Sequence, residues 1–257
     1  MAQQRRRLDV ALVRRGLLPS RTAAADAIAA GRVRVAGAVA DKSSRMVSPG
    51  ESVAVDGPPA RFVGRGGEKL LAALEQWPLI SQAVNGSRAI DCGSSTGGFT
   101  DCLLQHGAAT VLSVDVGRGQ LHQRLLTDSR VTSMERTDIR ELDPTAIGGT
   151  FDVLVADLSF ISLTTVASSL IALCRVGAPM VLLVKPQFEV GRQIASEGKG
   201  VISEDSDRQM ALEKVRSTFE RLRCDTIGVM ECPIHGADGN REYLLALRAP
   251  SDGPVTL

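Results

Sequence analysis

The stretch Ile90–Asp101, IDCGSSTGGFTD, decides the fold of this chain. Apolar residues lead into Asp91, small residues fill the segment from Gly93 to Gly98, and the residues after it can begin a helix. A strand, a tight glycine loop and a helix start, in this order, hold a nucleotide-like ligand against the backbone. The pattern therefore predicts a doubly wound α/β domain with a ligand site at this loop.

The spacing of the glycines narrows the choice of ligand. Ser95 stands where a dinucleotide fingerprint needs its second glycine, and Phe99 follows Gly98 where a phosphate-binding P-loop needs lysine. An acid just before such a loop suits a ligand with an ammonium group and no phosphate, such as S-adenosylmethionine, although a plain strand-to-helix turn would use similar glycines. The predicted cofactor-binding residues here are Asp91, Gly93, Ser94, Ser95, Thr96, Gly97, Gly98 and Phe99.

Further acids follow the next two predicted strands. Thr110–Asp115 (TVLSVD) is apolar and ends in an acid 22 positions after Gly93, where a doubly wound fold binds ribose hydroxyls. Asp138 follows Val131–Met134 and is placed to meet the adenine. Each aspartate is also a normal helix-cap or turn residue. These segments add Asp115, Val116, Asp138 and Ile139 to the predicted cofactor site.

Two polar residues come directly after strongly apolar strands. Asp157 follows Phe151–Ala156, and Lys185 follows Met180–Val184. Continuous apolar runs are typical of buried parallel strands, whose carboxyl ends line the ligand crevice. A lysine in such a crevice can serve as a base, because burial disfavours its charged form. A helix cap for Asp157 and a surface cation for Lys185 are the alternatives.

Composition sets the outer limits of the prediction. The chain has 257 residues, of which 44% are hydrophobic, enough for one full core and a small extra domain. It has no run of roughly 20 apolar residues that could cross a membrane. Its five cysteines are scattered and lack metal-ligand spacing, so we expect reduced thiols, no metal site, no membrane insertion and a cytoplasmic location.

The charge is divided unevenly along the chain. Residues 1–69 hold 13 lysines and arginines against six acids, which leaves 17 basic and 23 acidic residues for the remainder. A basic head on an acidic body indicates that the head meets a polyanion. The predicted RNA-binding residues are Arg6, Arg7, Arg14, Arg15, Arg21, Arg32, Arg34 and Arg65.

The local pattern of this head predicts a compact unit. Apolar residues between Leu8 and Leu17 mark a short helix that stops near Gly16. Ser20 caps a second helix, Arg21–Ala30, which Gly31 ends. Strands follow at 32–35 (RVRV), with both arginines on one face, and at 52–55 (SVAV). Two helices and a small sheet of this kind form an RNA-binding unit, unless the basic face is merely solvated.

The segment RLDVALVRRGLLPSRTAAADAIAAGRVRVAG, starting at Arg7, closely resembles an S4-type RNA-binding domain. The rest of the chain resembles FtsJ-like ribose methyltransferases, and the whole resembles the TlyA family of ribosomal RNA cytidine 2′-O-methyltransferases, also labelled haemolysins. The motifs that support the resemblance are RGGEKL (65–70), DCGSSTGGFTD (91–101), ADLSFISL (156–163), VKPQFEVG (184–191) and GNREYL (239–244).

This resemblance implies a fold, a domain division and a catalytic set. The fold is an α/β, Rossmann-like methyltransferase sheet whose last strand, Arg241–Arg248, is antiparallel; its alternating pattern predicts an edge strand. The domains are the RNA-binding domain at 1–60, a linker at 61–67 and the methyltransferase domain at 68–257. The family's catalytic residues fall on Lys69, Asp157, Lys185 and Glu242, and Asp157 also belongs to the cofactor site.

The expected reaction is transfer of a methyl group from S-adenosyl-L-methionine to a ribose 2′-hydroxyl of ribosomal RNA. The expected partners are ribosomal RNA or ribosomal subunits, and no feature assigns an oligomeric state. The polar stretch Gly191–Gly200 could fold over RNA or be an ordinary surface loop. The alternatives are a catalytically silent ribosome assembly factor and a haemolysin-like membrane-active protein.

Overall fold

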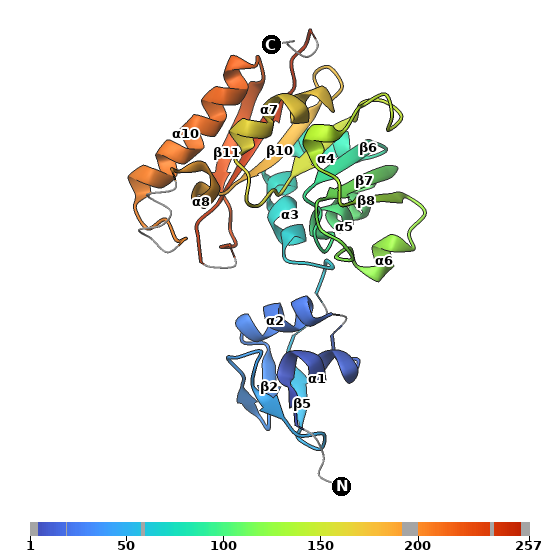
Figure 1. Cartoon of the computed structure of the whole chain (residues 1–257), viewed down its shortest axis with the longest axis vertical. Helices are drawn as coiled ribbons and strands as arrows, with labels where there is room; N and C mark the ends of the chain where they lie inside the picture. The colour runs from blue at the N-terminus through green and yellow to red at the C-terminus, as the bar shows by residue number, and fades with distance from the viewer. Residues whose placement is uncertain (1–4, 19, 58–59, 192–199, 237–238, 253–257) are drawn as a thin grey trace. The chain divides into compact units, whose positions relative to one another are not determined.

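The computed structural model describes residues 5–18, 20–57, 60–191, 200–236 and 239–252. The chain divides into two compact units, Met1–Arg65 and Gly66–Leu257. Each unit is described by itself (Figure 1). Residues 192–199 of the polar stretch expected to fold over RNA lie outside the described residues.

The first unit packs two helices against short strands. Buried apolar residues of both helices meet Val33 and Val35 of the central strand in one core. Ser20 caps the second helix, since its side chain accepts a hydrogen bond from the Ala23 amide, which confirms the predicted cap. The elements are β1 (Arg6–Arg7), α1 (Leu8–Arg14), α2 (Arg21–Ala29), β2 (Val33–Val35), β3 (Ala38–Val39), β4 (Met46–Val47) and β5 (Val53–Val55), paired as β3-β2-β5 and β1-β4.

The second unit contains one large sheet with helices between its strands. It opens with α3 (Gly66–Gln76) and α4 (Pro78–Val84), so the last two residues of the predicted linker are helical. The remaining helices are α5 (Gly98–Gln105), α6 (Gln123–Leu126), the 3-10 turn η1 (Ile139–Glu141), α7 (Leu163–Ala172), α8 (Pro186–Glu189) and α10 (Asp205–Arg221). The strands are β6 (Arg88–Cys92), β7 (Thr110–Asp115), β8 (Val131–Glu135), β9 (Val153–Ala156), β10 (Pro179–Val184), β11 (Asp225–Glu231) and β12 (Tyr243–Arg248).

The sheet order is β11-β12-β10-β9-β6-β7-β8. Five neighbouring strands, β10, β9, β6, β7 and β8, are parallel. Strand β12 pairs antiparallel with both β10 and β11. The doubly wound fold and the antiparallel last strand are therefore confirmed. The predicted edge position of the last strand is wrong: β12 lies inside the sheet, and Tyr243–Leu247 are all buried because neighbours cover them on both sides.

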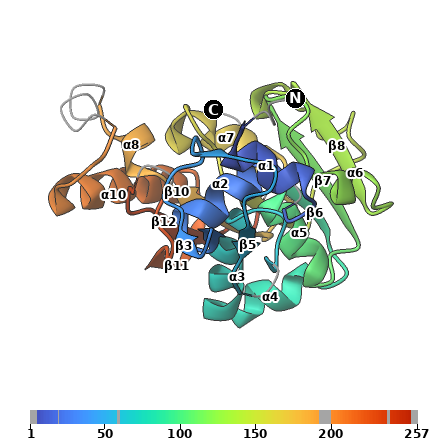
Figure 2. The same cartoon turned by 90° about the horizontal axis from the view of Figure 1, so that it is seen from below.

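Helices cover both faces of this sheet. Ile90 and Cys92 share a core cluster with α7 and α10. Asp91 points the opposite way and is bonded to Thr100 of α5, because successive strand residues face opposite sides. Since α3 packs on α5, the two helix groups enclose the sheet, as Figure 2 shows. Among the described residues, no helix has the length and apolar character needed to cross a bilayer.

Candidate active site

The glycine loop lies at the point where the strand order reverses. The chain runs from β6 to β7 on one side, and β9 pairs on the other side of β6. Gly93 has φ +85, and a Cβ atom there would lie 2.6 Å from the carbonyl oxygen of Asp157. Only glycine allows this approach. The loop after β6 and the acid after β9 are therefore in contact, at the usual ligand crevice of such sheets.

Asp115 holds the glycine loop to the end of β7. Its carboxylate accepts hydrogen bonds from the Ser95 amide and the Gly117 amide, both at 2.7 Å. The next residue, Val116, is 70% exposed. An acid beside an exposed apolar side chain suits a nucleoside, which needs a partner for its hydroxyls and a surface for its base. These residues fit the predicted cofactor.

Asp91 occupies a different place from the one expected. It is fully buried beneath the loop, and its Oδ2 accepts a hydrogen bond of 2.6 Å from the Thr100 hydroxyl, which also meets Ser113. Burial raises the pKa of Asp91 to about 7, against the opposing effect of the Thr100 hydrogen bond. Its carboxylate supports the loop from below, and its part in holding the ligand stays a prediction.

The rest of the loop is packed against neighbouring segments. Ser94 and Phe99 are buried, and a Cβ on Gly66 would lie 3.3 Å from the Phe99 ring. The amide of His122 donates to the carbonyl of Thr96, and Gly97, with φ +93, begins α5. The loop conformation is thus fixed by contacts with α3 on one side and with His122, at the start of α6, on the other.

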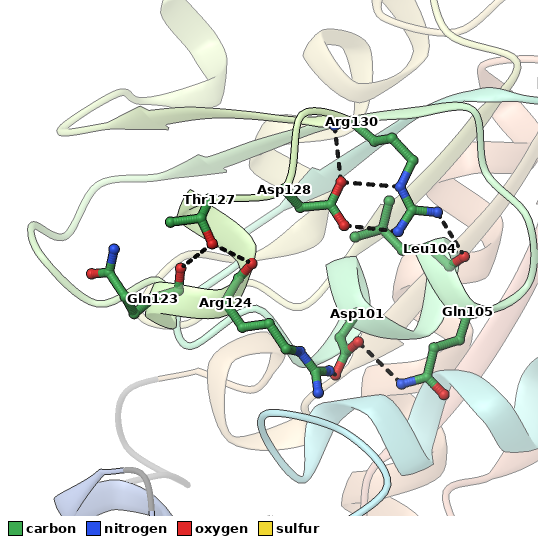
Figure 3. Close-up of polar contacts among 8 residues, drawn as sticks. All are labelled: Asp101, Leu104, Gln105, Gln123, Arg124, Thr127, Asp128 and Arg130. Atoms are coloured by element: carbon green, nitrogen blue, oxygen red, sulfur yellow. Dashed lines mark hydrogen bonds and ion pairs between the residues drawn. The ribbon is translucent and has the colours of Figure 1, made fainter.

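The short helix α6 packs against the glycine loop. Leu121 and Leu125, next to and within α6, lie so close to Gly97 that a Cβ there would overlap them. Arg124 of α6 pairs with the buried Asp101 of α5 at 2.5 Å (Figure 3). This ion pair fixes α6 against the helix that the glycine loop begins.

Asp138 and Ile139 follow β8 as predicted, but their contacts are structural. Asp138 caps η1 through the Arg140 amide and pairs with the Arg140 guanidinium at 2.5 Å. Ile139 is buried in the core. The structure supports the capping interpretation of Asp138, and contact with a base stays a prediction.

Two ion pairs contain the four predicted catalytic residues, of which Lys69, Lys185 and Glu242 are buried and Asp157 is partly buried. The Lys185 amine lies 2.6 Å from the Asp157 carboxylate, and the Lys69 amine lies 2.5 Å from the Glu242 carboxylate. The antiparallel register of Val184 with Tyr243 brings the end of β10 beside the start of β12, and α3 delivers Lys69 to β12. Elements far apart in the sequence thus build one site.

Cys232 lies near residues of both ion pairs. Its thiol is buried, which raises its pKa, and it lies within electrostatic reach of Lys69, Glu242 and Asp157. The lysines and acids therefore form one compact cluster with balanced charge. Within the described ranges, no three His, Cys, Asp or Glu side chains gather in a way that could hold a metal ion.

Two residues beside the cluster were not predicted. The Lys185 amine donates to the Ser159 hydroxyl at 2.8 Å. Phe160 is 93% exposed, has the unusual φ of +66, and its ring centroid lies 5.4 Å from that of Phe188. Their only signal in the sequence is their place inside the motifs ADLSFISL and VKPQFEVG, which gives no role to either residue.

In the first unit, buried Asp9 gathers two of the predicted RNA-binding arginines. Its carboxylate pairs with Arg7 at 3.1 Å and with Arg21 at 2.9 Å. Hydrogen bonding from Arg7 and Arg21 lowers the pKa of Asp9 to about 2, against the effect of burial. Two exposed guanidinium groups are therefore held side by side.

The other six predicted arginines have different surroundings. Arg32 and Arg34 both bond to Asp56, and Arg6 and Arg14 lie on β1 and α1. Arg65 pairs with Asp26 at 3.1 Å. Arg15 differs from the rest: its guanidinium donates to the carbonyls of Ser48, Pro49 and Glu51 and so fixes a turn of its own unit.

Comparisons with known proteins match a different family to each of the two parts of the chain. Residues 62–249 match the FtsJ-like methyltransferase family, and residues 6–53 match the S4 domain. The 16S/23S rRNA (cytidine-2′-O)-methyltransferase TlyA of Mycobacterium tuberculosis is 45% identical over 97% of this chain and 92% of its own. Hemolysin A of Brachyspira hyodysenteriae is 35% identical over 93% of this chain and 98% of its own.

A solved structure is similar over nearly the same span. It belongs to a Streptococcus thermophilus protein with the provisional name hemolysin, and it superimposes with a TM-score of 0.76 at 37% identity. The alignment covers 98% of this chain and 91% of that chain.

Proposed function

Because this chain belongs to the FtsJ-like methyltransferase family, and within it to the TlyA group, we propose that it methylates a cytidine 2′-hydroxyl of ribosomal RNA. The S4 domain at its start belongs to the same proposal, since a basic module next to a methyltransferase can hold the RNA substrate. The single observation that supports the reaction is the largely buried cluster of Lys69, Asp157, Lys185 and Glu242.

The cofactor is S-adenosyl-L-methionine, which supplies an activated methyl group on a sulfonium. Asp115 would hold its ribose, Val116 would contact its base, and the loop from Gly93 to Gly98 would form the floor beneath it. The close approach of Gly93 to the Asp157 carbonyl supports a cofactor site beside the proposed catalytic cluster.

The four clustered residues divide the work on the ribose hydroxyl. Lys185 withdraws or orients the 2′-hydroxyl proton, and Asp157 and Ser159 fix the direction of its amine. Glu242 holds Lys69, which contacts RNA or completes the balance of charge. Holding the hydroxyl in line with a fixed donor turns a slow bimolecular step into a rapid one.

The two rival functions have weaker support. A silent assembly factor would have no use for two buried lysines paired with carboxylates, because burying such charges costs free energy that the ion pairs only partly offset. The haemolysin name of some relatives has no matching feature here, since no helix in the described parts of the chain could span a membrane. An rRNA target and five free, buried cysteines favour a cytoplasmic location.

Mapping 2′-O-methylated riboses in ribosomal RNA tests the proposal directly. RNA from cells with and without the gene should differ at one or more cytidines, and purified protein with S-adenosylmethionine should restore the modification to unmodified subunits. Identical maps, together with no methyl transfer to either subunit in vitro, would contradict the proposed function.

A further inference from the structure

Glu189 is a buried acid to which the reaction has so far given no role. It is the last residue of α8 and only 3% exposed. Its Oε2 accepts a hydrogen bond of 2.5 Å from the Ser162 hydroxyl, and its Oε1 accepts one of 2.7 Å from the Leu163 amide. Burial raises the pKa of Glu189, while these two hydrogen bonds lower it. Both oxygens are therefore bonded to the first turn of α7.

These bonds join the two loops that contain the catalytic Asp157–Lys185 pair. The loop after β9 runs from Asp157 to Ser162, and the connection after β10, which runs from Lys185 to Val190 and contains the short helix α8, is called the second loop here. At their near ends, the loops are joined by the 2.6 Å ion pair between Lys185 and Asp157. At their far ends, they are joined by Glu189, so the two loops form a closed frame.

Contacts inside the frame concern the reacting groups. Ser159 accepts a hydrogen bond from Lys185, and the rings of Phe160 and Phe188 lie 5.4 Å apart. Phe160 has φ +66, a conformation that a non-glycine residue keeps only when its surroundings fix the backbone. Glu189 supplies such a constraint two residues further along the chain, and Lys214 of α10 holds the Glu189 carbonyl at 2.9 Å.

We infer that Glu189 is a positioning residue for methyl transfer, which holds Lys185 in its working geometry by tying its loop to the start of α7. The inference rests on the proposed function. A carboxylate suits this role because it accepts both bonds at once and carries a negative charge at a helix N-terminus. A glutamine can accept only through its single oxygen, and its amide group would face a donor.

The test compares single-turnover rates at saturating S-adenosylmethionine and ribosomal RNA, well below the melting temperature. Glu189→Gln should lower the rate roughly 10- to 100-fold, the effect expected of a small misplacement of a catalytic group. The dissociation constant for S-adenosylmethionine should stay within about twofold, since no bond of Glu189 reaches the glycine loop in the described structure. Glu213→Gln, on the exposed face of α10, is the matched control and should keep the wild-type rate.

A second variant tests the same frame from its other side, at Ser162, which also caps α7 by accepting a hydrogen bond of 3.1 Å from the Thr164 amide. Ser162→Ala removes one bond to the carboxylate and should lower the rate several-fold; in the Glu189→Gln background it should add little, because both changes open the same frame. If Glu189→Gln does not fold, Ser162→Ala alone decides. A folded variant with the wild-type rate, or a loss that affects cofactor affinity and rate equally, would overturn the inference. Absence of transfer by the wild-type protein would instead refute the proposed function.

Discussion

The Lys185 amine interacts with two oxygen atoms: it forms an ion pair with Asp157 and donates a hydrogen bond to Ser159. Such a fixed amine contributes most when the proton of the substrate hydroxyl moves, so its effect belongs to the transition state. Lys185→Ala should lower the single-turnover rate by about 10²- to 10⁴-fold, the range for a general acid or base.

Calorimetry on the same Lys185→Ala variant should give a nearly unchanged affinity for S-adenosylmethionine. Near-normal turnover would remove this lysine from the mechanism, and a loss of cofactor affinity would make it a binding residue instead.

Asp91 should make stability depend on pH in an unusual direction. Its pKa is raised from 3.8 to about 7 in the folded state. The folded protein therefore holds a proton that the unfolded chain has lost between about pH 4 and 7, and stability from this group falls as the pH rises through that window. Relative to wild type, Asp91→Asn should gain up to about 4 kcal/mol in unfolding free energy across the window. Denaturant titrations from pH 4 to 8 measure this difference. A difference in unfolding free energy between the two proteins that stays the same at every pH would contradict the prediction.

Phe160 exposes its ring next to Phe188, whose ring centroid lies 5.9 Å from the Lys185 amine, and it does so at the expense of backbone strain. An exposed aromatic ring next to a site for RNA can stack on a base, and stacking contributes about 1–3 kcal/mol per base. Phe160→Ala should therefore lower kcat/KM for RNA by about tenfold or more and leave cofactor affinity unchanged. Phe160→Trp should keep most of the activity. Equal activity of the alanine and tryptophan variants would exclude stacking.

At the scale of elements, α6 should control how well the cofactor loop is formed. Arg124→Ala removes the ion pair of buried Asp101, which keeps its hydrogen bond from Gln105, and so weakens the attachment of α6 to α5 (Figure 3). The leucines that pack on Gly97 would then loosen, and the dissociation constant for S-adenosylmethionine should rise about 3- to 10-fold, or roughly 1 kcal/mol.

This measurement is made without RNA, so that lost phosphate contacts do not enter. Arg216→Ala, which breaks an exposed ion pair on α10, is the control and should bind the cofactor like wild type. An unchanged affinity of the Arg124→Ala variant would show that α6 does not support the loop.

The strands show what the sequence can and cannot predict. The predicted strand Thr110–Asp115 agrees with β7, and the apolar run Met180–Val184 agrees with β10, because buried parallel strands are continuously apolar. β11 (Asp225–Glu231) was not predicted, since its half-exposed edge alternates and contains Gly228. β12 was predicted as an edge strand from the alternating pattern of Arg241–Arg248; its place inside the sheet depends on β11, which pairs with it from a part of the chain without a clear pattern.

For the whole molecule, the charge division leads to a prediction about RNA binding. A shortened protein that begins at Phe62 keeps Lys69 and the second unit, so it should fold and bind S-adenosylmethionine. It loses eleven of the 13 basic residues of positions 1–69, Arg61 included. Each lost phosphate contact lowers the salt slope of RNA binding by somewhat under one unit. RNA affinity and methylation should fall sharply, and equal methylation at physiological salt would contradict this role of the basic head.

The same scale explains how the site was predicted. Asp157 and Lys185 follow from a topological rule, since strand ends converge in a parallel sheet. Lys69 and Glu242 lie on α3 and just before an antiparallel strand, where no rule places them, and only the family resemblance identified them. The roles of Ser159 and Glu189 depend on hydrogen bonds between loops, and sequence periodicity carries no information about such bonds.

The pairing of Lys69 with Glu242, which stand 173 positions apart, also sets an order of events during synthesis. Domains form as the chain leaves the ribosome, N-terminal part first. The RNA-binding unit is complete within its first 65 residues, whereas the catalytic cluster must wait for the segment that enters the sheet between β10 and β11. A growing chain of this enzyme can therefore complete its S4 domain before the residues proposed to transfer the methyl group come together.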